Sequence, residues 1–184
     1  MQLRNLYTLI YFPGTRVVPY TPVNSRLRAY RLTWHIGSRE EEKALLDFWE
    51  SHRGGYNRFW CPIWDNRYVL WEDYVAGNLT IRIQPAKFTD TYTGYDRIFV
   101  FYNDTLYIRK VVGAEKYSDH EALTLDSGIG VDLNVGEQFP FGDCILARFE
   151  NNQLDIRYRY AEGDKVLATA SAVIVELPQE YEEF

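Results

Sequence analysis

The chain has 184 residues, of which 46% are hydrophobic, 16% aromatic and 25% charged. This hydrophobic content excludes an intrinsically disordered chain, because disordered chains carry too few apolar residues to form a core. Lysine and arginine number 20 and aspartate and glutamate 26, so the net charge is −6, which argues against tight nucleic-acid binding by displacement of phosphate counterions. A chain of this length can bury a stable core without disulfides or a metal.

The N-terminal residues lack the basic and then apolar pattern of a secretory signal peptide, and no segment approaches the roughly 18 apolar residues of a transmembrane helix. We therefore expect a protein made in the cytosol that does not insert into a membrane. Its two cysteines, Cys61 and Cys144, are far apart in the sequence and lie beside apolar residues. We expect two buried free thiols rather than a disulfide, with burial raising the pKa of Cys61 and leaving it unreactive.

Residues 31–36 form the first clear strand, because apolar and polar side chains alternate there with a period of two. One face carries Leu32, Trp34 and Ile36. The same alternation over Leu79–Ile83 predicts another strand farther along the chain.

An amphipathic helix is predicted between these strands. Ser38 is a good N-cap, and Glu41 three residues later completes a capping box. Apolar residues then recur at helical spacing, so the helix should pack on a sheet through Leu45, Phe48 and Trp49. The pair Gly54-Gly55 should end it.

Two hairpins are predicted in the second half of the chain. The first joins Ile98–Tyr102 to Leu106–Val112 through a turn at Asn103-Asp104. The second joins Cys144–Phe149 to Leu154–Tyr160 through a turn at Asn151-Asn152.

A last long strand, Val166–Leu177, should follow Gly163-Asp164, whereas residues 84–96 and 127–143 are rich in loop-forming residues. The order of one strand, one helix and then many strands predicts a mainly β fold with one flanking α-helix, as a β-sandwich or barrel.

The sequence carries no nucleophile elbow, P-loop, zinc-protease or Cys-x-x-Cys motif. Its histidines, His35, His52 and His120, are separated by whole elements, and only His120 lies among carboxylates, in an expected solvated turn. We predict that the protein is not an enzyme and has no catalytic residues, metal or cofactor. The dense aromatic residues Trp60, Trp64, Tyr68 and Trp71 could stack on sugars, but such residues more often form a core or a subunit interface.

The stretch from Leu27 to Tyr68 combines a strand, a Glu-rich capped helix ending in Phe-Trp, a His-x-Gly-Gly segment and a Phe-Trp-x-Pro segment. In these features it resembles the minor tail protein M and distal tail protein families of long-tailed bacteriophages. The expected final hairpin and the long strand running into Val175–Pro178 agree with that resemblance.

The resemblance implies a particular domain organisation. Compact members of these families pass almost directly from the Phe-Trp-x-Pro strand to the final hairpin, whereas this chain carries a long β-rich segment between them. We therefore expect a tail-tube-like ring domain formed by 1–70 and 144–178, a β-rich insertion or sheet extension at 71–143, and an acidic C-terminal tail at 179–184.

The resemblance also implies a function. Such proteins form a ring, here expected to be a homo-hexamer, between the tail tube protein on one side and the tail-tip or baseplate hub protein on the other. Phage DNA passes through the lumen, and an acidic lumen would let it slide because like charges repel. The expected location is the virion tail, assembled in the cytoplasm of the host bacterium.

Two sets of site residues follow. A subunit contact, or the core beneath one, is expected at Gly54, Gly55, Phe59, Trp60, Pro62 and Trp64, although ordinary strand core explains the same residues nearly as well. The alternative function is a host-surface carbohydrate-binding β-module in the insertion, with glycan contacts at Phe88, Tyr92, Tyr95 and Tyr102.

Overall fold

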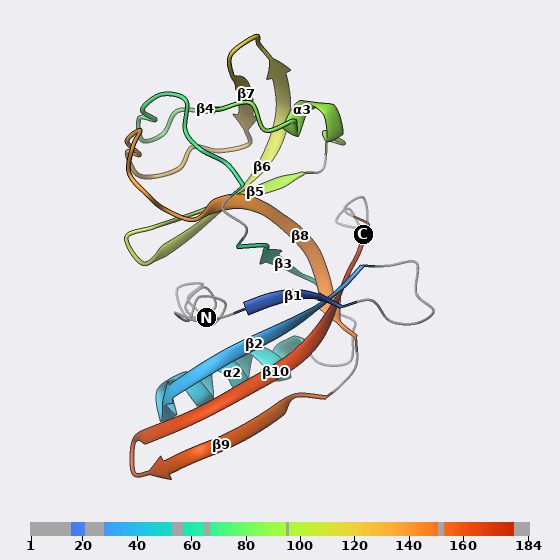
Figure 1. Ribbon diagram of the computed structural model, residues 1–184, viewed down its shortest axis with the longest axis vertical. Helices are drawn as coiled ribbons and strands as arrows, with labels where there is room; N and C mark the ends of the chain where they lie inside the picture. Colours follow the sequence, from blue (N-terminus) through green and yellow to red (C-terminus); the bar gives the residue numbers. More distant parts are fainter. Residues whose placement is uncertain are drawn as a thin grey trace. The chain divides into compact units, whose positions relative to one another are not determined.

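The computed structural model describes residues 16–20, 28–52, 57–64, 67–94, 96–150 and 153–178. Most regular structure in this part of the chain is β-strand, which confirms the predicted mainly β class (Figure 1). The chain divides into two units, one from the described parts of residues 1–61 and 146–178, the other from residues 62–145. Residues 62–70, expected in the ring domain, therefore belong to the second unit. Neither described helix has the length and apolar character needed to cross a membrane.

The first unit contains an antiparallel sheet. Its strands β1 (Arg16–Tyr20), β2 (Ala29–Ser38), β10 (Lys165–Glu176) and β9 (Asp155–Glu162) follow one another in that order. The last residues of β8 (Phe141–Phe149) pair with the end of β10, and β3 (Phe59–Pro62) pairs with β8.

The predicted helix is α2 (Arg39–His52), and Ser38 caps its start as expected. The Oγ atom of Ser38 accepts a hydrogen bond from the backbone N–H of Glu41 at 3.2 Å. The Glu41 carboxylate reaches back to the N–H of Gly37 at 2.6 Å, one residue before the usual position in a capping box. The predicted end at Gly54-Gly55 lies outside the described residues.

The packing face of α2 is also confirmed, since Leu45, Phe48 and Trp49 are all buried. The helix lies against one face of β2 and β10 (Figure 1). On that face small residues of β10 stand opposite large residues of β2: Ala168 opposite Ile36, Ala170 opposite Trp34, and Ala172 opposite Leu32. Because alanine side chains are small, they leave space for the helix to pack closely on the sheet.

The predicted hairpin between Cys144–Phe149 and Leu154–Tyr160 is wrong. β8 and β9 instead lie one after the other along the same edge of β10, with β8 pairing to Ile174–Glu176 and β9 to Lys165–Ser171. The hairpin of this region is β9–β10, which turns at Gly163-Asp164. Alternation along a strand does not specify its partner, and this caused the error. The turn residues Asn151-Asn152 lie outside the described residues.

The second unit contains β4 (Thr80–Ile83), α3 (Phe88–Thr91), β5 (Arg97–Tyr102), β6 (Thr105–Lys116) and β7 (Glu121–Leu125). The strand order runs from the start of β8 through β5, β6 and β7 to β4, and all pairs are antiparallel. The predicted β5–β6 hairpin is confirmed. Asn103 and Asp104 have φ of 49° and 54°, as a type I′ turn requires.

The core of the second unit includes segments that the sequence analysis assigned to loops. Phe88, within predicted loop 84–96, is buried at the start of the short helix α3. Ile129 and Leu133, within predicted loop 127–143, are also buried, and Leu133 exchanges two backbone hydrogen bonds with Tyr74 at 2.8 and 2.9 Å. Glycine is required at Gly128, because an added Cβ would lie 2.5 Å from the backbone of Gly77.

The packing face of α2 can be tested by substitution. Leu45→Ala should lower the free energy of unfolding by about 2–5 kcal/mol, because Leu45 is fully buried and a cavity would remain. The neighbouring substitution Leu46→Ala is the control, since Leu46 is 39% exposed and should change stability by less than about 0.5 kcal/mol. Urea unfolding followed by circular dichroism measures both values, and equal losses would contradict the assigned packing face.

Candidate functional site

Four of the six residues predicted to form a subunit contact are described by the structure, and two of these four are buried. Phe59 and Pro62 are buried, whereas Trp60 and Trp64 are half-buried. The Phe59 ring packs against Phe48 and Phe149, with centroids 5.3 and 5.1 Å away. Gly54 and Gly55 lie outside the described residues.

Trp64 belongs to the second unit, where it packs against β5. Its ring lies edge-on to Phe99 and Phe101, with centroids 5.0 and 5.8 Å away. Because Phe99 is fully buried, removing the Trp64 ring would disturb packing as well as any surface that it forms.

Of the residues predicted to contact a glycan, the three that the structure describes do not form an exposed platform. Phe88 is buried, and Tyr92 and Tyr102 are half-buried. The Tyr92 hydroxyl donates to the backbone oxygen of Val111 at 3.1 Å, and the Tyr102 hydroxyl donates to Glu137 at 2.9 Å. Tyr95 lies outside the described residues.

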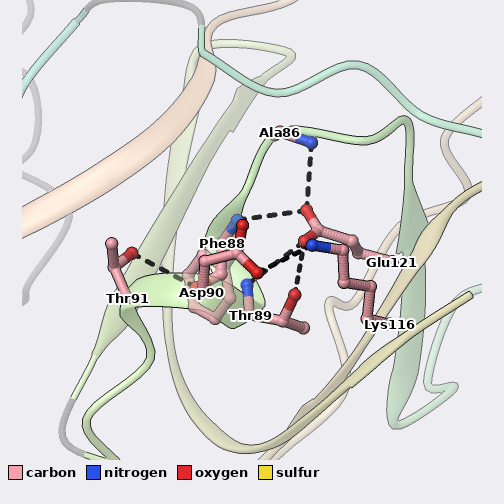
Figure 2. Close-up of polar contacts among 7 residues, drawn as sticks. All are labelled: Ala86, Phe88, Thr89, Asp90, Thr91, Lys116 and Glu121. Carbon is pink, nitrogen blue, oxygen red and sulfur yellow. Dashed lines mark hydrogen bonds and ion pairs between the residues drawn. The ribbon is translucent and has the colours of Figure 1, made fainter.

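Glu121 is a buried carboxylate that holds α3 in place (Figure 2). One oxygen accepts from the backbone N–H groups of Ala86 and Phe88 at 3.0 and 3.1 Å. The other accepts from the N–H and the hydroxyl of Thr89 at 3.2 and 2.6 Å. Burial acts to raise the pKa of Glu121, but these four hydrogen bonds together hold that pKa below its ordinary value. The carboxylate is therefore ionised and structural.

An exposed aromatic cluster lies on the same unit, formed by Trp71, Tyr117 and His120. The His120 ring stacks with Tyr117 at a centroid distance of 4.5 Å and an interplanar angle of 5°, and with Trp71 at 5.9 Å and 11°. Trp71 is 42% exposed and Tyr117 is 47% exposed. Large apolar rings are thus presented to solvent in a fixed, nearly parallel arrangement.

Backbone hydrogen bonds position the aromatic cluster. The N–H of Tyr117 donates to the carbonyl of His120 at 2.9 Å, which closes the turn between β6 and β7. The N–H of Trp71 donates to the carbonyl of Arg82 at 2.9 Å, which places Trp71 beside β4. His120, expected as a solvated turn residue, is thus in a turn but is half-buried against aromatic rings.

Charged groups surround the aromatic cluster. Asp119 lies 2.8 Å from Nδ1 of His120, and Glu72 pairs with Arg82. The Tyr117 hydroxyl donates to Glu115 at 2.6 Å, and this hydrogen bond is the main cause that raises the Tyr117 pKa.

Two clefts open on the second unit. The larger, of about 500 Å³, is lined by residues 68–70, 134 and 136–140. Its Tyr68 is buried and donates its hydroxyl to Asp143, so the Tyr68 ring contributes to the core. The smaller, here called the polar hollow, measures about 230 Å³ and is lined by Glu72, Asp73, Tyr74, Asn78, Leu79, Thr80 and Arg82. It adjoins the aromatic cluster through the backbone, because Glu72 follows Trp71 in the chain and the carbonyl of Arg82 accepts the N–H of Trp71.

A different exposed surface lies on β9 of the first unit. All four consecutive residues Arg157, Tyr158, Arg159 and Tyr160 are exposed. A β-bulge between Leu167 and Ala168 shifts the register, so that Tyr160 pairs with the exposed Leu167 and Tyr158 with the buried Ala168. The Tyr158 hydroxyl donates to Glu42 of α2.

The cysteines behave as predicted. Both are buried free thiols, and burial raises the pKa of Cys61 to about 12, which leaves its thiol protonated. Across the described ranges, no group of three or more His, Cys, Asp or Glu side chains is placed to hold a metal ion.

Comparison of the chain with protein-family models and with curated proteins found no match.

Glu121 should make stability depend on pH. Because its folded pKa is lowered, its contribution is fully present above the unfolded pKa and is lost as pH falls through the folded pKa. Glu121→Gln should destabilise the second unit by about 1–3 kcal/mol at pH 7, and the difference from wild type should shrink at acidic pH. Urea unfolding at pH 7 and below pH ~4 measures this effect.

The matched control is Asp104→Asn, which also removes one carboxylate but lies in an exposed turn that accepts asparagine. It should be nearly neutral. A Glu121→Gln loss that stays constant with pH would show that packing, rather than ionisation, explains the role of Glu121.

Proposed function

We propose that this protein is a structural subunit of the tail tip of a long-tailed bacteriophage, as its resemblance to minor tail protein M and distal tail proteins implies. Six copies form a ring between the tail tube protein and the tip hub, and phage DNA passes through the lumen. The first unit forms the tail-tube-like ring domain, built as a sandwich or barrel. The protein acts without catalysis, in the virion tail, after assembly in the cytoplasm of the host bacterium.

The observation that best supports assembly is the composition of β9. Residues 157–160 alternate arginine and tyrosine, and all four side chains are exposed. Tyrosine and arginine are among the residues that contribute most to binding energy at protein interfaces. Within the described residues, β9 pairs with β10 alone, so its outer edge is available to a neighbouring subunit.

The same edge is protected against indiscriminate pairing. Arg157 and Arg159 place positive charge on β9, and the bulge at Leu167/Ala168 distorts the ladder. Charges and bulges on edge strands discourage edge-to-edge aggregation. Such an edge suits a specific side-chain interface. A closed ring requires two different complementary faces on each subunit, and β9 is proposed as one of them.

The test is the mass of the purified protein by light scattering, alone and with tail extract as a template. A six-fold mass, or a ring at the tail tip in electron images, is expected. Tyr160→Lys should weaken self-association at least about 30-fold, as expected for loss of a central interface residue. Circular dichroism should show an unchanged fold, because Tyr160 is 47% exposed.

Val75→Lys is the control for this substitution, because Val75 is 58% exposed in a turn of the second unit. It should leave the mass unchanged. A wild-type chain that stays monomeric and never enters tails would contradict the proposed function. Unchanged assembly of Tyr160→Lys would exclude Tyr160 from the interface.

A further inference from the structure

We propose that the second unit binds neutral carbohydrate at the aromatic cluster of Trp71, Tyr117 and His120, with the adjacent polar hollow receiving the sugar hydroxyls. This inference goes beyond the proposed tail function and does not depend on it. It also places the glycan site away from Phe88, Tyr92 and Tyr102, which contribute to packing.

The rings of the aromatic cluster expose apolar surface to solvent. Trp71 and Tyr117 keep 42% and 47% of their surface accessible, although large aromatic side chains gain free energy when buried. Stacking on His120 holds the rings nearly parallel before any ligand arrives. A preordered surface loses little conformational entropy on binding. The C–H face of a pyranose ring can stack on the part of the Trp71 or Tyr117 ring that His120 leaves exposed.

The polar hollow offers groups that can bind the hydroxyls of a sugar. Its lining combines carboxylates, an amide, a hydroxyl and a guanidinium, from Glu72, Asp73, Asn78, Thr80 and Arg82. These groups offer both donors and acceptors, as the hydroxyls of a sugar require. Small-molecule sites typically combine an apolar wall with a few convergent polar groups.

Local charge selects the class of sugar. Asp73, Glu115 and Asp119 lie around the cluster and the hollow in addition to the Glu72–Arg82 pair. Lys116, at the end of β6, pairs instead with Asp90 at 2.7 Å. The surroundings are therefore net acidic and should repel uronic or sialic acids. Neutral hexoses carry no charge and are therefore not repelled by these carboxylates.

A protein partner is the competing occupant. Its interface would bury about 800 Å² on each side around an apolar centre. Here charged side chains lie at the rings, as Glu72, Asp119 and Arg82 show, whereas the centre of a protein interface is depleted of charge. The observations therefore favour a small polar ligand that covers the rings and reaches the hollow.

The experiment is a glycan array carrying neutral hexose oligosaccharides and uronic-acid oligosaccharides, probed with the full chain, followed by calorimetry on the sugars that bind. Neutral oligosaccharides should bind and acidic ones should not. Trp71→Ala and Tyr117→Ala should each weaken binding at least tenfold, and Trp71→Phe should retain most of it. Glu72→Gln should weaken binding without unfolding the chain, because Glu72 is exposed.

Leu46→Ala is the control, since Leu46 is an exposed apolar residue of α2 in the first unit, and its glycan binding should equal that of wild type. Failure to bind any neutral oligosaccharide would overturn the proposal, as would equal losses in the control. Loss of tail assembly in Trp71→Ala without glycan binding would assign the cluster to a protein partner. Ring formation by wild type is measured separately and tests the proposed tail function alone.

Discussion

The contrast between small and large side chains on one face of the first sheet determines how that unit is built. Alanines of β10 lie directly opposite isoleucine, tryptophan and leucine of β2, and α2 covers this face with Leu45, Phe48 and Trp49. Larger residues in place of the alanines would push the helix outward, because interiors are packed without spare volume. The position of α2 also brings its Glu42 close to β9. The Glu42 carboxylate accepts one hydrogen bond from Arg39 at 2.6 Å and another from the hydroxyl of Tyr158 in β9. The edge strand is thus tied to the helix through one carboxylate.

The second unit is organised around a buried charge as well as an apolar core. Glu121 begins β7 and gathers the N–H groups of the segment that leads into α3. Among the described residues, that segment pairs with no strand. Its buried N–H groups would cost free energy without an acceptor, and the Glu121 carboxylate supplies one. Phe88 can then insert into the core beside Tyr68, with ring centroids 5.9 Å apart. The hydrogen bonds to Glu121 therefore allow the Phe88 ring to pack in the core.

Features set by neighbouring residues could be predicted from the sequence. The Ser38 cap, the packing face of α2 and the Asn103-Asp104 turn all depend on contacts within a few residues. Pairings between distant segments could not be predicted in this way. The placement of β9 beside β10 depends on register, and the burial of Glu121 depends on donors more than thirty residues away. The aromatic cluster joins Trp71 to the turn between β6 and β7, so no local motif marks it. The sequence marks Trp71 as one of several dense aromatic residues and His120 as a turn residue, but only the fold stacks the two rings.

The two ends of the second unit are hydrogen-bonded to each other. The N–H of Ile63 donates to the carbonyl of Asp143 at 3.0 Å, and the N–H of Tyr68 donates to the carbonyl of Phe141 at 3.1 Å. Paired strands lie about 5 Å apart, so a tight turn could replace everything between them without displacing either end. Domains whose termini adjoin are tolerated as insertions within other domains. The second unit thus has the adjoining ends that an inserted domain requires, and a short connection between them is the smallest change that would delete it.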